Sequence, residues 1–69
     1  MTEPLLQFNE QARPCPPGLT LAALLQREGL APERVATALN ARFVPRAARE
    51  QTLLQPGDRV STFQAIVGG

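Results

Sequence analysis

The sequence predicts an α+β fold, in which a mixed sheet of about five strands carries one main helix across one face. One stretch, residues 19–30, combines helical spacing of its leucines with signals for both ends of a helix. Short apolar runs bounded by proline, glycine or asparagine precede and follow that stretch. With 69 residues, the chain can form one core. Together these observations predict the order β-β-α-β-β-β.

Two strands are expected before the helix. The run Leu-Leu-Gln-Phe at residues 5–8 indicates a short strand, residues 9–11 suit a turn, and residues 12–15 indicate a second, weaker strand. Proline cannot donate to a ladder of backbone hydrogen bonds, so the nearby prolines favour an edge position for the second strand. These prolines are Pro14, Pro16 and Pro17. We therefore expect an N-terminal hairpin.

The helix has the clearest pattern in the chain. Thr20 is a residue type preferred at a helix N-cap. Gly29, with Leu30 after it, suits the position that follows a helix C-terminus, where a left-handed conformation is common. One apolar stripe at helical spacing would face the core, and it consists of Leu21, Leu24 and Leu25. A helix of this length needs a sheet to cover the stripe.

The residues after the helix predict two further strands. Residues 35–39 are rich in small and branched side chains and precede a turn at Asn40. The turn leads into a short strand at residues 43–44, which Pro45 ends. Asn40 and the dipeptide Pro45-Arg46 are interpreted as structural turn residues, with partner contact as a second role for Arg46.

The last third of the chain predicts an irregular segment and a final strand. Residues 47–50 suit a single helical turn, and Leu53 and Leu54 are both expected to anchor the segment to the core. Pro56-Gly57 suits the centre of a type II turn, which Asp58 would order. Residues 59–66 then predict a strand, and their mixed pattern favours partial cover on both faces.

This order of elements has one simple topology. The hairpin can place the first strand beside the last one, in parallel, with the helix crossing one face of the sheet. That is the β-grasp, or ubiquitin-like, arrangement. We expect residues 1–65 to form a single β-grasp domain and residues 66–69 to form a flexible C-terminal tail that ends in Gly-Gly.

Composition argues against several classes of function. The chain has no histidine and one cysteine, Cys15, and no group of residues has the spacing of metal ligands. A free-standing enzyme is therefore not expected, because no activated nucleophile or general base is available. The seven basic residues are all arginines and are interspersed with carboxylates, which favours a solvated surface over a nucleic-acid-binding stripe.

The chain also lacks membrane and export signals. No stretch is long and apolar enough to span a bilayer. Residues 1–4 do not have the basic and then apolar pattern of a signal peptide. We therefore expect a cytoplasmic protein that binds no membrane.

The two terminal glycines suggest a carboxylate that works chemically. A carboxylate is a poor electrophile and must be activated, for instance as an acyl-adenylate, before a nucleophile can attack it. Because glycine has no Cβ, Gly68 and Gly69 could pass through a narrow channel of an activating enzyme and present the carboxylate to ATP. The chain would then be a co-substrate, and its partner would supply the catalysis.

Ordered segments over nearly the whole chain carry a resemblance. They are Leu-Gln-Phe-Asn-Glu-Gln at residues 6–11, Gly-Leu-Thr-Leu at 18–21, Leu-Asn-Ala-Arg-Phe-Val-Pro-Arg at 39–46, Pro-Gly-Asp-Arg-Val at 56–60 and Val-Gly-Gly at 67–69. In this order they resemble the ThiS family, the sulfur carriers of thiamine thiazole biosynthesis. The segment at 39–46, similar to the family's Val-Pro-Arg stretch, is the most specific of them.

The resemblance implies a reaction sequence. Gly69 would be adenylated by a ThiF-type enzyme that consumes ATP, and sulfur from a cysteine desulfurase would convert the adenylate into a thiocarboxylate. That sulfur would pass to a thiazole synthase of the ThiG type. The residues that would thread the partners' sites are Gln64, Ala65, Ile66, Val67 and Gly68. The chain itself would bind no metal or cofactor and catalyse no step.

Other interpretations stay open at this point. A sulfur carrier could instead serve molybdopterin synthesis or the thiolation of an amino acid or a tRNA, although Ala65-Ile66-Val67 lacks the prolines usual before the terminal glycines of molybdopterin-synthase small subunits. A ubiquitin-like binding module with an inert tail, or a protein modifier, are further alternatives. Phe63, like Arg46, is a possible partner contact. Cys15 is expected to be a small, partly buried strand residue, with a nucleophile or persulfide acceptor as its alternative role.

Overall fold

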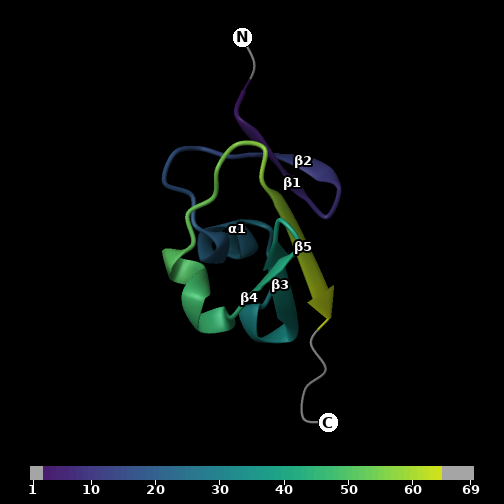
Figure 1. Cartoon of the computed structure of the whole chain (residues 1–69). Coiled ribbons are helices and arrows are strands. Elements are labelled where there is room, and N and C mark those ends of the chain that lie inside the picture. The colour runs from purple at the N-terminus through teal and green to yellow at the C-terminus, as the bar shows by residue number, and fades with distance from the viewer. Residues whose placement is uncertain (1–2, 65–69) are drawn as a thin grey trace.

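The computed structural model describes residues 3–64, which form a five-stranded mixed sheet, one α-helix and two 3₁₀-helices (Figure 1). In chain order the elements are β1 (Leu5–Phe8), β2 (Gln11–Pro14), α1 (Leu21–Arg27), η1 (Pro32–Arg34), β3 (Val35–Leu39), β4 (Arg42–Val44), η2 (Arg46–Gln51) and β5 (Arg59–Gln64). Helix α1 and the green segment that contains η2 lie on the same side of the sheet. The predicted α+β class and element order are confirmed.

Strand β5 lies at the centre of the sheet, whose strand order is β2-β1-β5-β3-β4. Strand β1 pairs with β5 in parallel through Gln7 and Phe8. Strand β3 pairs with β5 in antiparallel fashion along its whole length, from Val35 to Leu39. The first and last strands are therefore parallel neighbours, and the predicted β-grasp arrangement is confirmed.

Two tight turns close the hairpins β1–β2 and β3–β4. Each has two central residues with positive φ, which gives a turn whose twist matches that of the paired strands. These residues are Asn9 (48°), Glu10 (69°), Asn40 (51°) and Ala41 (68°). Because the first turn needs only two residues, β2 begins at Gln11 and ends at Pro14. The predicted strand at 12–15 is thus shifted by one residue, and Cys15 lies just outside β2.

Helix α1 begins and ends where the sequence predicts. The Oγ1 of Thr20 accepts a hydrogen bond from the N–H of Ala23 at 3.1 Å, which satisfies one of the first N–H groups of the helix. Gly29 follows the C-cap with φ of 75°, and the N–H of Leu30 donates to the carbonyl of Leu25 at 3.0 Å. The predicted apolar stripe is buried, and it consists of Leu21, Leu24 and Leu25.

The core lies between α1 and one face of the sheet. Burying a leucine side chain stabilises a fold by about 1.5–3 kcal/mol, so α1 is held mainly by packing. The buried apolar side chains are Leu6, Phe8, Cys15, Leu21, Leu24, Leu25, Val44, Leu54 and Val60. None of the helices in the part of the chain that the structure describes is long and apolar enough to cross a membrane.

The segment between β4 and β5 corrects one prediction. Leu54 is 3% exposed and packs into the core, but Leu53 is 57% exposed and does not anchor the segment. The backbone explains the difference, because the N–H of Leu54 donates to the carbonyl of Leu19 at 2.8 Å and an isolated bridge links Leu53 to Thr20. In this extended geometry successive side chains point to opposite sides.

The ends of this segment agree with expectation. The helical turn predicted at residues 47–50 is part of the longer 3₁₀-helix η2, Arg46–Gln51. Gly57 has φ of 90°, and the N–H of Asp58 donates to the carbonyl of Gln55 at 3.0 Å, as a type II turn requires.

The helices cover strand β5 on one face only. Val60 is buried against the core, whereas Phe63 is 57% exposed on the opposite face. On that open face the expected partial cover is found only at Ser61, which is half-buried between the neighbouring strands, because within residues 3–64 both α1 and η2 pack on the other side of the sheet. The strand is described to Gln64, and the predicted continuation to Ile66 lies outside the described residues.

Candidate functional site

The candidate site is centred on the end of strand β5. Gln64 is the last residue of that strand and is exposed, as is Phe63 before it. Gly69, the predicted sulfur-carrying residue, lies outside the described residues, together with the predicted threading residues Ala65, Ile66, Val67 and Gly68. The described part of the site is therefore the end of β5, from Thr62 to Gln64.

Asn40 holds the beginning of β5. Its Oδ1 accepts from the N–H of Arg59 at 2.9 Å, and its own N–H donates to the carbonyl of Arg59 at 2.7 Å. Its Nδ2 donates to Oδ1 of Asp58 at 3.1 Å. The second carboxylate oxygen of Asp58 accepts from the N–H of Gln55 at 2.8 Å. Asp58 therefore links the turn at residues 55–58 to the β3–β4 turn. The predicted structural roles of Asn40 and Asp58 are confirmed.

Asn9 holds the later part of β5 from the opposite edge. Its Oδ1 accepts from the N–H of Thr62 at 2.9 Å, and its Nδ2 donates to Oγ1 of Thr62 at 2.8 Å. Its backbone N–H donates to the carbonyl of Val60 at 2.9 Å. Strand β5 is thus held on each side by an asparagine from a two-residue turn.

The face of the sheet that points away from α1 carries an apolar patch. Phe63 lies opposite Ala36 on β3, and Phe43 on β4 lies opposite Ala38. Alternation along the strands places all four on one face, because Thr37, between the two alanines, is fully buried on the other. We call Ala36, Ala38, Phe43 and Phe63 the open-face patch. Phe43 is 70% exposed, so the patch offers aromatic surface to a partner.

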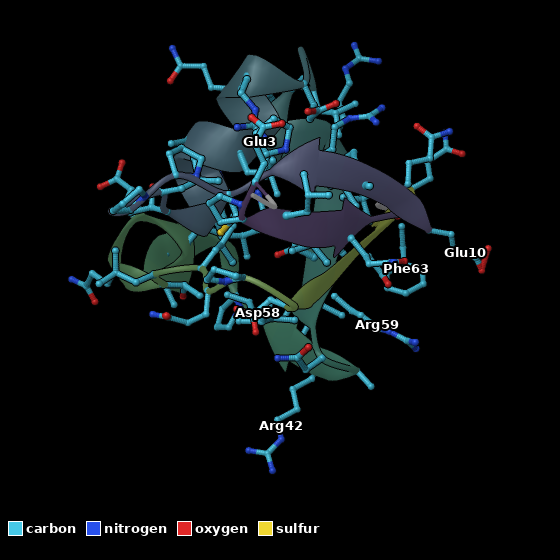
Figure 2. The ribbon with its side chains drawn as sticks, turned by 90° about the horizontal axis from the view of Figure 1, so that it is seen from above. Glu3, Glu10, Arg42, Asp58, Arg59 and Phe63 are labelled. Carbon is cyan, nitrogen blue, oxygen red and sulfur yellow. The ribbon has the colours of Figure 1, made fainter. Side chains whose placement is uncertain are left out.

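Polar side chains border the open-face patch. Arg59 and Phe63 lie four positions apart on β5, an even spacing that puts them on the same face, and Figure 2 shows both side chains projecting to the same side. A shallow depression of about 380 Å³ lies beside them and is lined by Gln7, Glu10, Arg59, Val60 and Ser61. An apolar centre with a charged rim is the usual composition of a protein-binding surface.

Arg46, the other predicted partner contact, lies on the opposite side of the molecule. It begins η2 and lines a depression of about 430 Å³ between α1, η1 and η2, together with Ala22 and Leu30. The structure therefore does not bring Arg46 together with Phe63. A single partner surface on the open face would include Phe63 and not Arg46.

Arg49 is a buried residue that sequence reasoning placed on the solvated surface. It is 3% exposed, and its guanidinium donates to Oγ1 of Thr37 at 3.0 Å and to the carbonyls of Pro32 at 2.8 Å and Val35 at 2.6 Å. Among residues 3–64 no carboxylate forms an ion pair with it. Burial lowers the pKa of Arg49, and the positive charge of Arg46 lowers it further.

Cys15 is buried beneath the surface, at 2% exposure. Burial raises the pKa of its thiol, and the negative charge of Asp58 raises it further, while Arg27 opposes the shift. A protonated, buried thiol is a poor nucleophile. Cys15 is thus more deeply buried than the predicted partly buried residue, and this environment disfavours the alternative of a nucleophile or persulfide acceptor.

The described residues contain no cluster of histidine, cysteine, aspartate and glutamate that could hold a metal ion. Local sequence patterns did not predict the contacts of two side chains, Asn9 beside the site and Arg49 in the interior. Asn9 belongs to a predicted turn, but its contact with Thr62 joins residues that are 53 positions apart. The only local signal was asparagine at the first position of a two-residue turn, as at Asn40. For Arg49 the sequence offers no such signal.

Comparisons with known proteins agree with this geometry. The model of the ThiS family matches residues 6–69. The chain is 39% identical over 62 residues to the sulfur carrier protein ThiS of Escherichia coli (strain K12), which covers 90% of this chain and 94% of that protein. This chain is also similar to the crystal structure of thiamine biosynthesis protein ThiS from Geobacter metallireducens, with a TM-score of 0.80 at 26% identity. The match covers 94% of this chain and 99% of the Geobacter chain. The predicted family resemblance is confirmed: this chain belongs to the ThiS family.

Proposed function

We propose that this chain carries sulfur as a thiocarboxylate on Gly69 and delivers it during assembly of the thiazole ring of thiamine. Membership of the ThiS family, over a match that extends to Gly69, is the observation that carries the proposal. The exposed end of β5 and the open-face patch support it, because a carrier must present both its tail and a docking surface to successive enzymes.

The proposed chemistry begins at the carboxylate of Gly69. Its oxygen attacks the α-phosphate of ATP in a ThiF-type enzyme, which forms an acyl-adenylate and releases pyrophosphate. A persulfide sulfur, supplied by a cysteine desulfurase, then attacks the acyl carbon and displaces AMP. A thiol then attacks the other sulfur of the resulting acyl disulfide, forms a disulfide with it and releases the thiocarboxylate. Catalytic groups, ATP and Mg²⁺ belong to the partners in this scheme, and the carrier contributes position.

The open-face patch is the proposed docking surface for the activating enzyme. Phe63 is followed directly by Gln64, so a partner seated on the patch would lie beside the start of the tail. Residues 64–68 would extend from there through the partner's channel, with Gly68 providing the conformational freedom that a narrow passage requires. Because the scheme consumes ATP, the location that we propose for it is the cytoplasm.

Intact mass measures the proposed reaction directly. The chain is incubated with ATP, a ThiF-type enzyme, a cysteine desulfurase and cysteine, and we expect a mass increase equal to the replacement of one oxygen by one sulfur, mapped to Gly69. Deletion of Gly69 should abolish the increase and leave the circular dichroism spectrum unchanged, because residues 3–64 contain the sheet and the core. An unmodified wild-type chain, with an enzyme active on a known carrier, would contradict the proposal.

The acceptor is tested separately. The thiocarboxylated chain is mixed with a ThiG-type thiazole synthase, or with molybdopterin synthase as the comparison, and loss of sulfur from the chain is followed by mass. We expect transfer to the thiazole synthase only. Transfer to the second acceptor alone would move the chain to another pathway while leaving its carrier role intact.

A further inference from the structure

Strand β5 is supported unequally along its two edges. Strand β3 pairs with β5 from Val60 to Gln64, whereas β1 pairs with β5 only at Arg59 and Val60. Beyond that point the chain turns away at Asn9 and Glu10. Within the described residues, the edge of β5 that faces β1 therefore has no backbone strand beside Thr62.

The side chain of Asn9 takes the place of that missing strand. A primary amide has the same donor and acceptor groups as a peptide unit, and Asn9 uses both, on the N–H and on the hydroxyl of Thr62. The turn conformation makes this possible, since asparagine adopts a positive φ at lower cost than most other residues. The parallel ladder between β1 and β5 is thus extended by one side chain toward the tail.

We propose that Asn9 is a positioning residue for sulfur loading, which acts through Thr62 on the direction in which the chain leaves the sheet. This inference rests on the proposed function. Thr62 is followed by Phe63 of the open-face patch and then by Gln64, the last residue of β5. The two hydrogen bonds between Asn9 and Thr62 therefore fix the docking surface and the end of β5 relative to each other. This lowers the conformational entropy that is lost when the activating enzyme binds.

Asn40 provides a matched control within the same chain. It occupies the same position of the same kind of turn, with φ of 51° against 48° for Asn9, and it also uses its amide oxygen to accept from a backbone N–H of β5. It holds Arg59, at the far end of the strand from the tail. The variants Asn9→Gly and Asn40→Gly both keep a residue that tolerates positive φ. Each removes the hydrogen bonds that one side-chain amide makes to β5 or the residue before it.

Amide hydrogen exchange in the isolated protein tests the physical part of the inference. The N–H groups of successive residues in a strand point to opposite edges. Because the N–H of Thr62 points to Asn9, the N–H of Phe63 points to β3. Hydrogen exchange at Phe63 therefore reports on opening of the pairing between β3 and the end of β5. In Asn9→Gly we expect Phe63 to exchange about five- to tenfold faster than in the wild type, from the loss of one to two hydrogen bonds. In Asn40→Gly we expect a change of less than about twofold.

Adenylation kinetics test the functional part. With a ThiF-type enzyme, well below the melting temperature of each variant, the KM for Asn9→Gly should rise about fivefold or more while kcat changes little, since a frayed strand must be ordered on binding. Asn40→Gly should leave KM close to that of the wild type. Asn9→Asp should restore most of the loss, because its two oxygens can accept from the N–H and from the hydroxyl of Thr62.

Several results would overturn the inference. An unchanged KM for Asn9→Gly, or an equal rise for Asn40→Gly, would show that the contact between Asn9 and Thr62 contributes only to general stability. Failure of the wild-type chain to be adenylated would instead contradict the proposed function. In that case unaltered exchange at Phe63 in Asn9→Gly would separately refute the role of Asn9 in holding β5.

Discussion

At the residue scale, Arg49 determines how the segment around η2 is attached to the sheet. Its three acceptors belong to η1 and β3, so one guanidinium connects three elements. These acceptors are a hydroxyl and two carbonyls. Because the guanidinium is planar and rigid, the arginine side chain loses little conformational entropy for each hydrogen bond that it donates to them. Among the described residues no carboxylate offsets the burial of its charge, so the geometry of these contacts carries the interaction.

Replacing Arg49 by lysine should therefore destabilise the protein although it keeps the charge. A single ammonium group cannot reach three separated acceptors, and we expect a loss of about 1–3 kcal/mol in the free energy of unfolding. Arg46→Lys, at an exposed arginine three positions earlier in the same 3₁₀-helix, serves as the control and should change stability by less than about 0.5 kcal/mol. Urea unfolding measures both, and equal effects would refute this account of Arg49.

At the element scale, both hairpin turns contain strained backbone and also make hydrogen bonds to β5. Both asparagines suit their positions, but Glu10 and Ala41 also have positive φ, of 69° and 68°. For residues other than glycine this conformation costs about 1 kcal/mol. Ala41 is exposed, so its side chain offers little packing in return. The strain is maintained because the turn must present Asn40 to the start of β5.

Ala41→Gly should consequently stabilise the protein, by about 0.5–1 kcal/mol, since glycine adopts this conformation without the steric cost. The same substitution at Ala12, an exposed residue of β2 with no positive φ, should destabilise by a similar amount because glycine loses more backbone freedom in a strand. Thermal unfolding of the two variants should give shifts of opposite sign. A shift of the same sign in both would contradict the role assigned to the turn.

At the scale of the whole molecule, the fold separates stability from recognition. One face of the sheet is covered by α1 and η2 and contains the core, and the other presents the open-face patch. Substitutions on the open face should therefore affect partner binding more than folding. Leu53 offers a comparison, because it is as exposed as Phe63, at 57%, but lies on the segment between η2 and β5.

Phe63→Ser should weaken activation by a ThiF-type enzyme by about tenfold or more, seen as a higher KM, because an aromatic anchor of the docking surface is lost. Leu53→Ser removes an equally exposed apolar side chain elsewhere and should leave KM unchanged. Both variants should unfold within about 0.5 kcal/mol of the wild type. If Leu53→Ser were the more impaired variant, the docking surface would include the segment between η2 and β5 instead of the open-face patch.

Much of the fold was predictable because its signals are local. Thr20 and Gly29 mark the ends of α1 through groups within four residues of them, and the type II turn at Gly57 needs only its own dihedral angles. The family's ordered segments made the proposed site predictable as well. The position of β2 was one residue off, since the length of the Asn9–Glu10 turn depends on pairing with β1.

Element order, β-grasp topology, family and the proposed role of Gly69 follow from the amino-acid sequence alone. The folded chain was needed to show that Leu53 is exposed, that Arg49 is buried, and that Phe63 and Arg46 lie on opposite sides of the sheet. It was also needed to show that Asn9 holds Thr62, a contact across 53 positions. Each of these four features depends on which face or edge of the sheet a residue meets, and no local pattern of polarity or propensity specifies that partner.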